Sequence, residues 1–173
     1  MLLNLQVKNL ALIEKAEVSF SEGLNILTGE TGAGKSIIIG SVNMALGGKT
    51  SRDMIRQGAD YAYVELVFSV DDPVKRKRLE ELDLDLPEDG TIIISKKIMP
   101  TRSLSKINDE TVTTGRLKEI TSLLIDIHGQ HEHQSLLYKS KHLQILDAYA
   151  RSQTQPLKEK ISVNYHQYQE VLK

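Results

Sequence analysis

The sequence predicts an α/β fold in which helices pack on a mixed, partly antiparallel sheet. Apolar and polar residues alternate over residues 3–8, 15–20 and 61–70, which is the period of a half-buried strand. The period changes to the three- and four-residue steps of a helix over residues 35–46. A glycine-rich loop joins that helix to a short apolar run at 24–27, in the strand–loop–helix order of α/β proteins.

Length and composition are those of one ordinary globular domain. The chain has 173 residues, of which 40% are apolar and 26% charged, and its net charge is −1. The absence of cysteine excludes a disulfide framework, a thiolate metal site and a cysteine nucleophile. Balanced charge argues against a strongly basic nucleic-acid module, although a local basic patch stays open. Apolar runs fall short of the roughly 20 residues that span a bilayer, so we expect no membrane partner.

The order of elements follows from these patterns. The strands over 3–8 and 15–20 are expected to pair antiparallel, because the segment between them is short. Leu24–Leu27 is mostly apolar and is expected to be a buried central strand. The helix over 35–46 stops at the glycine pair 47–48. The other predicted elements are a strand over 61–70, a helix over 73–84, a turn over 87–90, a hairpin over 91–98 and 103–108, and a short helix over 140–149.

Two segments near the end of the chain allow more than one interpretation. Residues 115–125 fit a helix, or a helix followed by a strand. In the last stretch, apolar residues recur from Leu157 to Leu172 at helical steps, which fits an amphipathic helix or the start of a coiled coil. That pattern reaches Lys173 without a stop signal, so we expect the natural chain to continue; the alternative is a short C-terminal helix.

The strongest motif is a phosphate-binding loop. It fits G-x-x-x-x-G-K-[ST] in full, with Gly29, Glu30, Thr31, Gly32, Ala33, Gly34, Lys35 and Ser36. Its glycines let backbone N–H groups surround a phosphate, and the next helix aims its positive end there. Lys35 would hold the β- and γ-phosphates, and the Ser36 hydroxyl would hold Mg²⁺. These residues predict a P-loop NTPase, because a mere glycine-rich turn would not explain Lys-Ser at the helix start.

Hydrolysis would also need a carboxylate on Mg²⁺. Residues 123–125 could form an apolar strand that ends at Asp126, which would then hold the metal. The alternative is that Asp126 is only a polar residue at the end of a helix or strand.

Three stretches carry a resemblance to a known family. They are residues 23–36, Arg102-Ser103 with Ile107-Asn108, and residues 125–136, which read Ile-Asp-Ile-His-Gly-Gln-His-Glu-His-Gln-Ser-Leu. Together the chain resembles the N-terminal lobe of an SMC-type ATP-binding-cassette head, and more closely the RecN family of bacterial DNA repair and recombination proteins. The resemblance covers residues 1–150, and residues 151–173 then look like the start of the family's coiled coil.

The resemblance implies roles for several residues. Gln130 would be the Q-loop glutamine that reaches Mg²⁺ and the attacking water, with Gln134 as second choice, so Lys35 and Gln130 would be the catalytic pair. Asp126 would then not be the acidic Walker B residue, which such heads carry in a C-terminal lobe together with the signature motif. The sequence contains no Leu-Ser-Gly-Gly run.

Other positions match the family less specifically. Arg52 and Arg56 fall in a basic segment that approaches nucleotide or DNA in such heads, and Lys8-Asn9 falls near the base. Asp109 stands where the family often has glycine, although an Asn-Asp turn can serve there.

The same resemblance implies ligands and partners. The cofactors would be ATP and Mg²⁺, and the partners would be DNA, a second head and a C-terminal lobe of the same protein. The location would be cytoplasmic, at the bacterial nucleoid. The whole protein would be an ATPase for double-strand break repair, whereas this chain alone is expected to bind ATP without significant hydrolysis.

Plainer interpretations stand beside these. His128, His131 and His133 fit no common metal-ligand spacing. The basic run 75–78 precedes acidic residues and is expected to be a solvated helix face. As whole-chain alternatives, the sequence allows a complete small P-loop kinase that uses Asp126, another SMC-type head, or a non-catalytic interaction module.

Overall fold

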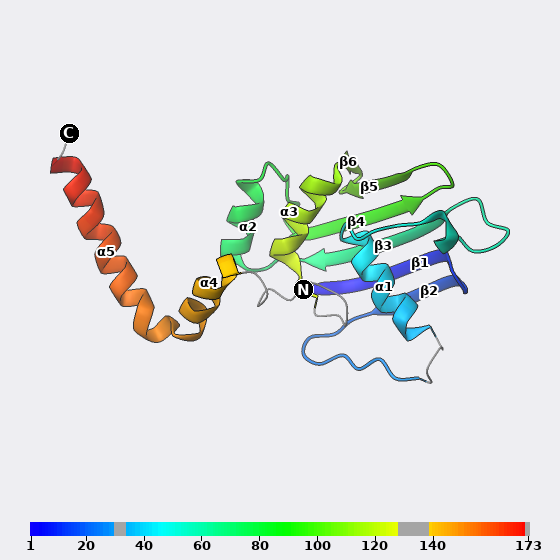
Figure 1. The fold of residues 1–173 in the computed structure, drawn as a ribbon, viewed down its shortest axis with the longest axis horizontal. Helices are drawn as coiled ribbons and strands as arrows, with labels where there is room; N and C mark the ends of the chain where they lie inside the picture. The colour runs from blue at the N-terminus through cyan, green and yellow to red at the C-terminus, as the bar shows by residue number, and fades with distance from the viewer. Residues whose placement is uncertain (30–33, 128–138, 172–173) are drawn as a thin grey trace. The chain divides into compact units, whose positions relative to one another are not determined.

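The residues that this computed structural model describes, 1–29, 34–127 and 139–171, include six strands in one sheet. The strands are β1 (Leu2–Leu10), β2 (Ile13–Ser19), β3 (Ala62–Ser69), β4 (Thr91–Ile98), β5 (Ser103–Ile107) and β6 (Glu110–Val112). Their order is β2-β1-β3-β4-β5-β6, and each neighbouring pair is antiparallel (Figure 1). The predicted β1–β2 and β4–β5 pairings are confirmed. The chain divides into two compact units, residues 1–126 and 127–173, and each is described by itself.

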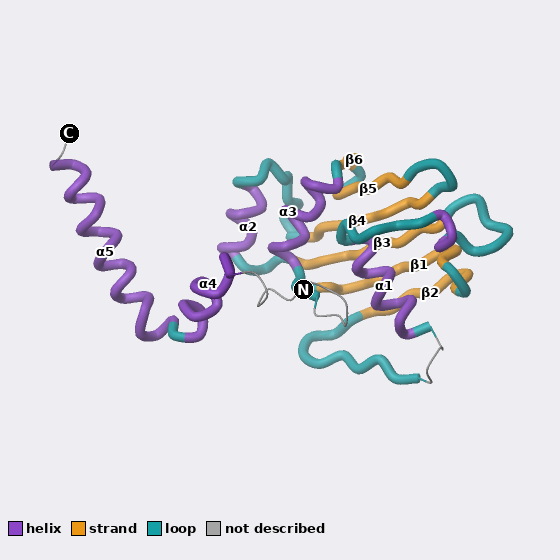
Figure 2. Tube along the Cα trace, viewed as in Figure 1, coloured by secondary structure: helices purple, strands orange, loops and turns teal. Residues whose placement is uncertain are grey.

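Helices of the first unit lie over one face of this sheet, which we call the inner face (Figures 1 and 2). They are α1 (Lys35–Ala45), α2 (Pro73–Glu80) and α3 (Thr114–Leu124), with a 3₁₀ turn at Arg52–Met54. α1 contacts β1, β3 and β4, while α3 contacts β5 and α2. The helical alternative for residues 115–125 is therefore the one that forms. Thr113 begins this helix, since its side chain accepts a hydrogen bond from the Arg116 N–H at 3.3 Å.

The alternation in β3 shows how the core forms. Ala62, Val64 and Leu66 are fully buried and Phe68 is 1% exposed, while the residues between them point to the opposite, outer face. Met44 and Ala45 of α1 and Leu117 and Ile120 of α3 cover them. Because each strand has one apolar face, the helices pack in a single layer on the inner side of the sheet.

The turns use residues suited to them. The β5–β6 hairpin turns through Asn108 and Asp109, both with positive φ (45° and 68°), as a two-residue primed turn requires. The Asn-Asp pair therefore replaces the family's glycine without difficulty. In the basic run, Arg76 donates to the carbonyls of Val70 at 2.7 Å and Glu88 at 3.2 Å, so it holds α2 against the neighbouring turn.

The expectation that Leu24–Leu27 is a buried strand is wrong for the described structure. Leu24 and Ile26 are 86% and 74% exposed, and the segment has no strand partner among the described residues. Asn25 explains part of this, because its side chain bonds the backbone of Ser21 through both its oxygen (3.0 Å) and its nitrogen (2.8 Å). A mostly apolar strand needs cover on both faces, and the described residues provide none for Leu24 and Ile26.

The described residues of the second unit form two helices, α4 (Lys139–Tyr149) and α5 (Arg151–Val171). The predicted helix over 140–149 and the helical tail are confirmed. Lys158 forms an ion pair with Asp147, and the Thr154 hydroxyl donates to the Ala150 carbonyl at 3.1 Å, which fixes the turn between them. The apolar residues of α5 are exposed. The coiled coil, and a boundary at residue 150, stay predictions. Among the described residues, we find no helix long and apolar enough to cross a bilayer.

One charged residue lies on the inner face. Lys96 of β4 is only 3% exposed, and its pKa is lowered by burial and, to a smaller extent, by the charge of Lys118 on α3. Burial disfavours the charged form, so the unfolded chain binds more protons below the ordinary lysine pKa, and the free energy of unfolding rises with pH there.

We therefore expect Lys96→Met to stabilise the protein at neutral pH by about 1 kcal/mol, because methionine keeps the apolar contacts and removes the buried charge. Chemical denaturation at pH 7 and at pH values approaching 10 measures this, and the alkaline rise in stability should disappear in the variant. The neighbouring Lys97→Met, on the outer face, serves as control and should not stabilise. Equal stability of Lys96→Met and the parent would contradict this interpretation.

Candidate nucleotide-binding site

The first turn of α1 is built to face an anion. Gly34 precedes it with φ +92°, and its carbonyl accepts hydrogen bonds from the N–H groups of Ile37 (3.0 Å) and Ile38 (2.9 Å). This described first turn contains no acidic residue. The positive end of the helix dipole therefore meets no acidic side chain within its own first turn.

Lys35 folds back toward that loop. Its ammonium donates to the carbonyl of Gly29, six residues earlier. Lys35 and Gly34 line a cavity of about 430 Å³. The rest of the wall comes from Leu12, Ile13, Glu14, Lys15, Ala16, Leu27, Thr28 and Ile38. This volume falls within the usual range for small-molecule and cofactor sites, so a nucleoside phosphate can be accommodated here.

The wall formed by residues 12–16 was not identified from the sequence. It is positioned by Arg56, whose guanidinium donates to the Leu12 carbonyl at 2.7 Å and lies 3.8 Å from the Glu14 carboxylate. The Arg56 N–H also donates to the Asn9 carbonyl at 2.9 Å. Arg56 thus supports the cavity wall, whereas Arg52 is exposed and lies 4.0 Å from Asp53.

The structure does not place every predicted residue in this cavity. Ser36 is exposed and lines a separate cavity of about 330 Å³ with Gly40, Asn43 and Lys49 of the α1 region. Lys8 projects from the outer face, and its ammonium is 5.9 Å from the centre of the Tyr61 ring. A place near the nucleotide base stays a prediction for Lys8 and Asn9.

An apolar strand ending at Asp126 is not observed. Leu123 and Leu124 are the last residues of α3 and pack against the core, and Asp126 follows in exposed, irregular chain. The apolar run is explained by the buried side of a helix end, which also removes the argument for a kinase carboxylate at this position.

Several predicted residues lie outside the described part of the chain. They are Glu30, Thr31, Gly32 and Ala33 of the loop, the two candidate Q-loop glutamines Gln130 and Gln134, and His128, His131 and His133. Within the described ranges, no group of three His, Asp or Glu side chains is arranged to hold a metal ion.

The glycine-capped helix, the returning lysine and the adjoining cavity define the nucleotide-binding lobe of a P-loop protein. The chain belongs to the AAA domain family, which matches residues 4–172. It is 42% identical to the DNA repair protein RecN of Halalkalibacterium halodurans over 97% of this chain and 30% of that protein. It is 39% identical to RecN of Bacillus subtilis over the whole of this chain and 30% of that protein. The chain thus spans under a third of the length of these curated relatives.

Solved structures show the same fold. An SMC ATPase, studied for ATP-driven dimerization and DNA-stimulated activation, superposes with a TM-score of 0.58 at 23% identity over 70% of this chain and 78% of that chain. An SMC head bound to the C-winged helix domain of ScpA gives 0.56 at 25% identity, over 70% of this chain and 40% of that chain. The recombination mediator RecF with ATP gives 0.51 at 17% identity, over 68% of this chain and 30% of that chain. The predicted fold class is therefore confirmed.

Two glycines of the site region allow a matched test of the helix cap. A Cβ built on Gly34 or on Gly40 meets no atom within 4 Å, but only Gly34 has a positive φ. We expect Gly34→Ala to destabilise the protein by about 1–2 kcal/mol, the cost of a left-handed conformation for an L-residue. Gly40→Ala, inside α1, should stabilise by about 0.5–1 kcal/mol.

Thermal unfolding of both variants measures these opposite shifts. If Gly34→Ala melts at or above the melting temperature of the parent, α1 does not require a left-handed backbone at residue 34.

Proposed function

We propose that this chain is the ATP-binding lobe of a RecN-like, SMC-type ATPase that acts in DNA double-strand break repair and recombination. The observation that carries the proposal is Lys35 turned toward Gly29 beside the Gly34-capped start of α1, at a cavity of nucleotide size. The RecN relatives support the DNA repair role. Such a protein works on DNA in the cytoplasm, at the nucleoid.

ATP would bind with Mg²⁺. The Ser36 hydroxyl is exposed on the first turn of α1, so it is available as a metal ligand, and oxygen is the donor that Mg²⁺ prefers. Gln130 would be the second ligand. The metal would neutralise phosphate charge, while Lys35 would hold the β- and γ-phosphates and the α1 N-terminus would orient them.

The lobe would be completed by a C-terminal lobe of the same protein. Leu24 and Ile26 are apolar and largely exposed, as expected of a segment that other residues of the whole protein cover. The relatives are more than three times as long as the segment that this chain matches. In the whole protein, two heads would enclose two ATP molecules, each P-loop facing the signature motif of the other head.

Nucleotide binding is tested through Lys35. Mg-ATP at about one hundred times its dissociation constant should stabilise the wild-type chain by roughly 2.7 kcal/mol, because a ligand that binds only the folded state shifts the folding equilibrium. Lys35→Ala should lose most of this shift, since a charge-assisted contact of this kind contributes roughly 1.5–3 kcal/mol. The melting temperature with and without Mg-ATP is the measurement.

Lys75→Ala is the matched control, because Lys75 is an exposed lysine of α2 on the same inner side of the molecule. It should respond to Mg-ATP as the wild type does. If Mg-ATP does not change the melting temperature of the wild type, the result would instead favour a non-catalytic interaction module.

Hydrolysis by this chain alone should be negligible, because the sequence carries no Leu-Ser-Gly-Gly motif to complete the site. Phosphate release from Mg-ATP measures it, with Lys35→Ala as the blank. Turnover that is robust in the wild type and absent in that variant would contradict the split-site proposal.

A further inference from the structure

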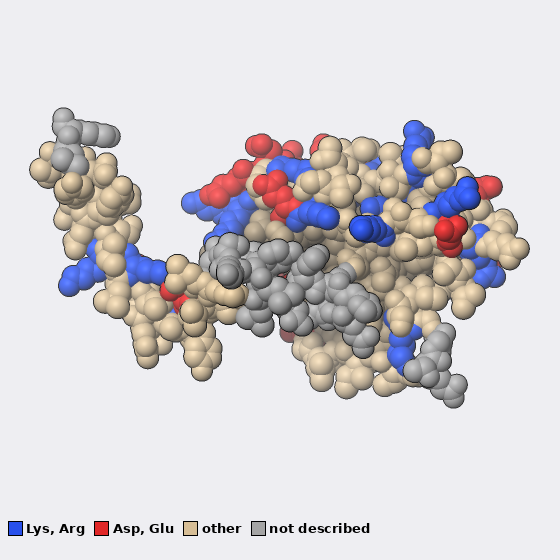
Figure 3. Space-filling view, in the orientation of Figure 1, with Lys and Arg blue, Asp and Glu red and all other residues tan. Residues whose placement is uncertain are grey.

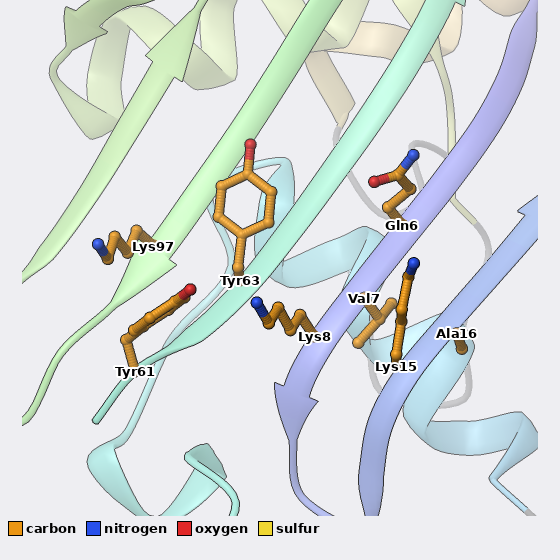
Figure 4. A pocket seen from close by; sticks show the side chains of 8 residues that line it. All are labelled: Gln6, Val7, Lys8, Lys15, Ala16, Tyr61, Tyr63 and Lys97. Atoms are coloured by element: carbon orange, nitrogen blue, oxygen red, sulfur yellow. The ribbon is translucent and has the colours of Figure 1, made fainter. Parts of the chain in front are cut away.

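The outer face of the sheet carries a row of three lysines, of which only Lys15 also lines the nucleotide cavity. Lys15 of β2 pairs with Lys8 of β1, Lys8 pairs with Tyr63 of β3, and Tyr63 pairs with Lys97 of β4. Figure 4 shows these side chains on one side of the sheet, with α1 behind it. We call Lys8, Lys15 and Lys97 the lysine row. They help to line a hollow of about 420 Å³ together with Gln6, Tyr61 and Tyr63.

The lysine row has no counter-charge among the residues that the structure describes. All three side chains are exposed, and none lies within 4.0 Å of a carboxylate of the described residues. Two like charges directly opposite each other on paired strands, as in Lys8 and Lys15, destabilise a sheet. The fold therefore tolerates an unfavourable pair that a bound anion would turn into a favourable one.

Acidic residues of the same face lie one register row away and have other partners. Glu17 accepts hydrogen bonds from the amides of Asn4 (3.2 Å) and Gln6 (3.4 Å). Glu65 accepts one from the Tyr63 hydroxyl at 2.5 Å. Burial and this carboxylate raise the pKa of Tyr63 to about 12, so its phenol adds no negative charge to the row.

Tyr61 helps to hold the lysines in place. The Lys97 ammonium lies 4.3 Å from the centre of its ring, and the Lys8 ammonium lies 5.9 Å from it. Contacts of this kind orient an ammonium without neutralising it. The hollow thus presents fixed positive charges beside polar and aromatic groups.

We propose that the lysine row binds the phosphodiester backbone of DNA, an inference that rests on the proposed function in DNA repair. Lys15 and Lys97 are three strand spacings apart, which is about 14 Å. Duplex DNA carries a charge for about every 1.7 Å of its axis, so several phosphates fall within that span. Lysines that meet phosphates on an open sheet face give affinity and position without reading sequence.

The basic run on α2 is a weaker candidate for the DNA-binding surface than the lysine row. In the run 75–78 of α2, Arg76 is occupied by the carbonyls of Val70 and Glu88. Acidic side chains are interspersed with basic ones over α2 (Figure 3). The exposed cations of this run nevertheless provide a control with the same change of charge.

The test compares two double variants of the complete protein that contains this lobe. The row variant, K8Q/K97Q, removes the two lysines of the row that do not line the nucleotide cavity, and the α2 variant, K75Q/K77Q, removes two exposed cations of α2. Fluorescence anisotropy measures binding of a short labelled DNA duplex over a series of salt concentrations. We expect the row variant to bind about tenfold more weakly and to reduce the salt slope by up to about 1.8, which is about 0.9 for each of the two phosphates that Lys8 and Lys97 neutralise.

The α2 variant should keep the wild-type salt slope. Thermal melting with and without Mg-ATP should show that both variants are folded and bind nucleotide. A single-stranded oligonucleotide, for which the slope changes by about 0.7 for each neutralised phosphate, identifies which form of DNA backbone occupies the row.

The outcomes separate this inference from the proposed function. If the row variant binds DNA like the wild type, or if both variants are weakened to the same extent, the lysine row is not the binding surface, while the proposed function stands. If the wild type itself binds neither duplex nor single strand at low salt, both fail. Weaker binding confined to the row variant, with its Mg-ATP shift intact, supports the inference.

Discussion

The packing of α1 on the inner face of the sheet is the interaction on which the site depends. Met44 and Ala45 are covered by the apolar side chains of β1, β3 and β4, so the axis of the helix is fixed relative to the strands. A helix held in this way cannot move its first turn independently. Gly34 and Lys35 are therefore presented beside the wall formed by residues 12–16, and the phosphate-binding end is a consequence of core packing.

Much of this arrangement follows from local patterns in the sequence. The alternation in β3 predicts which side chains are buried, because successive residues of a strand point to opposite faces and only one face is covered. The helix start at Lys35 is equally predictable, since the loop motif and the change of period coincide. Proline at the first position of α2, with Asp72 capping it, likewise marks a helix that forms.

The wrong strand prediction at 24–27 and the strand alternative at 123–126, which does not form, share a physical cause. Leu24–Leu27 and the run ending at Asp126 are both short apolar segments, and periodicity cannot say whether such a segment is a strand or part of a buried helix. The outcome depends on partners: α3 has a core to pack against, whereas Leu24 and Ile26 have no strand neighbour among the described residues. The lysine row is also beyond local patterns, because it depends on the register of four strands spread over residues 8 to 97.

Lys15 connects the nucleotide cavity with the outer face of the sheet. It lines that cavity and also the outer hollow, since β2 is the edge strand beside the glycine-rich loop. A ligand on either side changes the electrostatic field that this ammonium experiences, and β2 is rigidly paired with β1. Coupling between two sites is reciprocal: if an anion on the outer face alters nucleotide affinity, nucleotide must alter the affinity for that anion by the same factor. We therefore expect nucleotide binding and DNA binding to influence each other at β2, the edge strand that carries Lys15, and not through the core of the sheet.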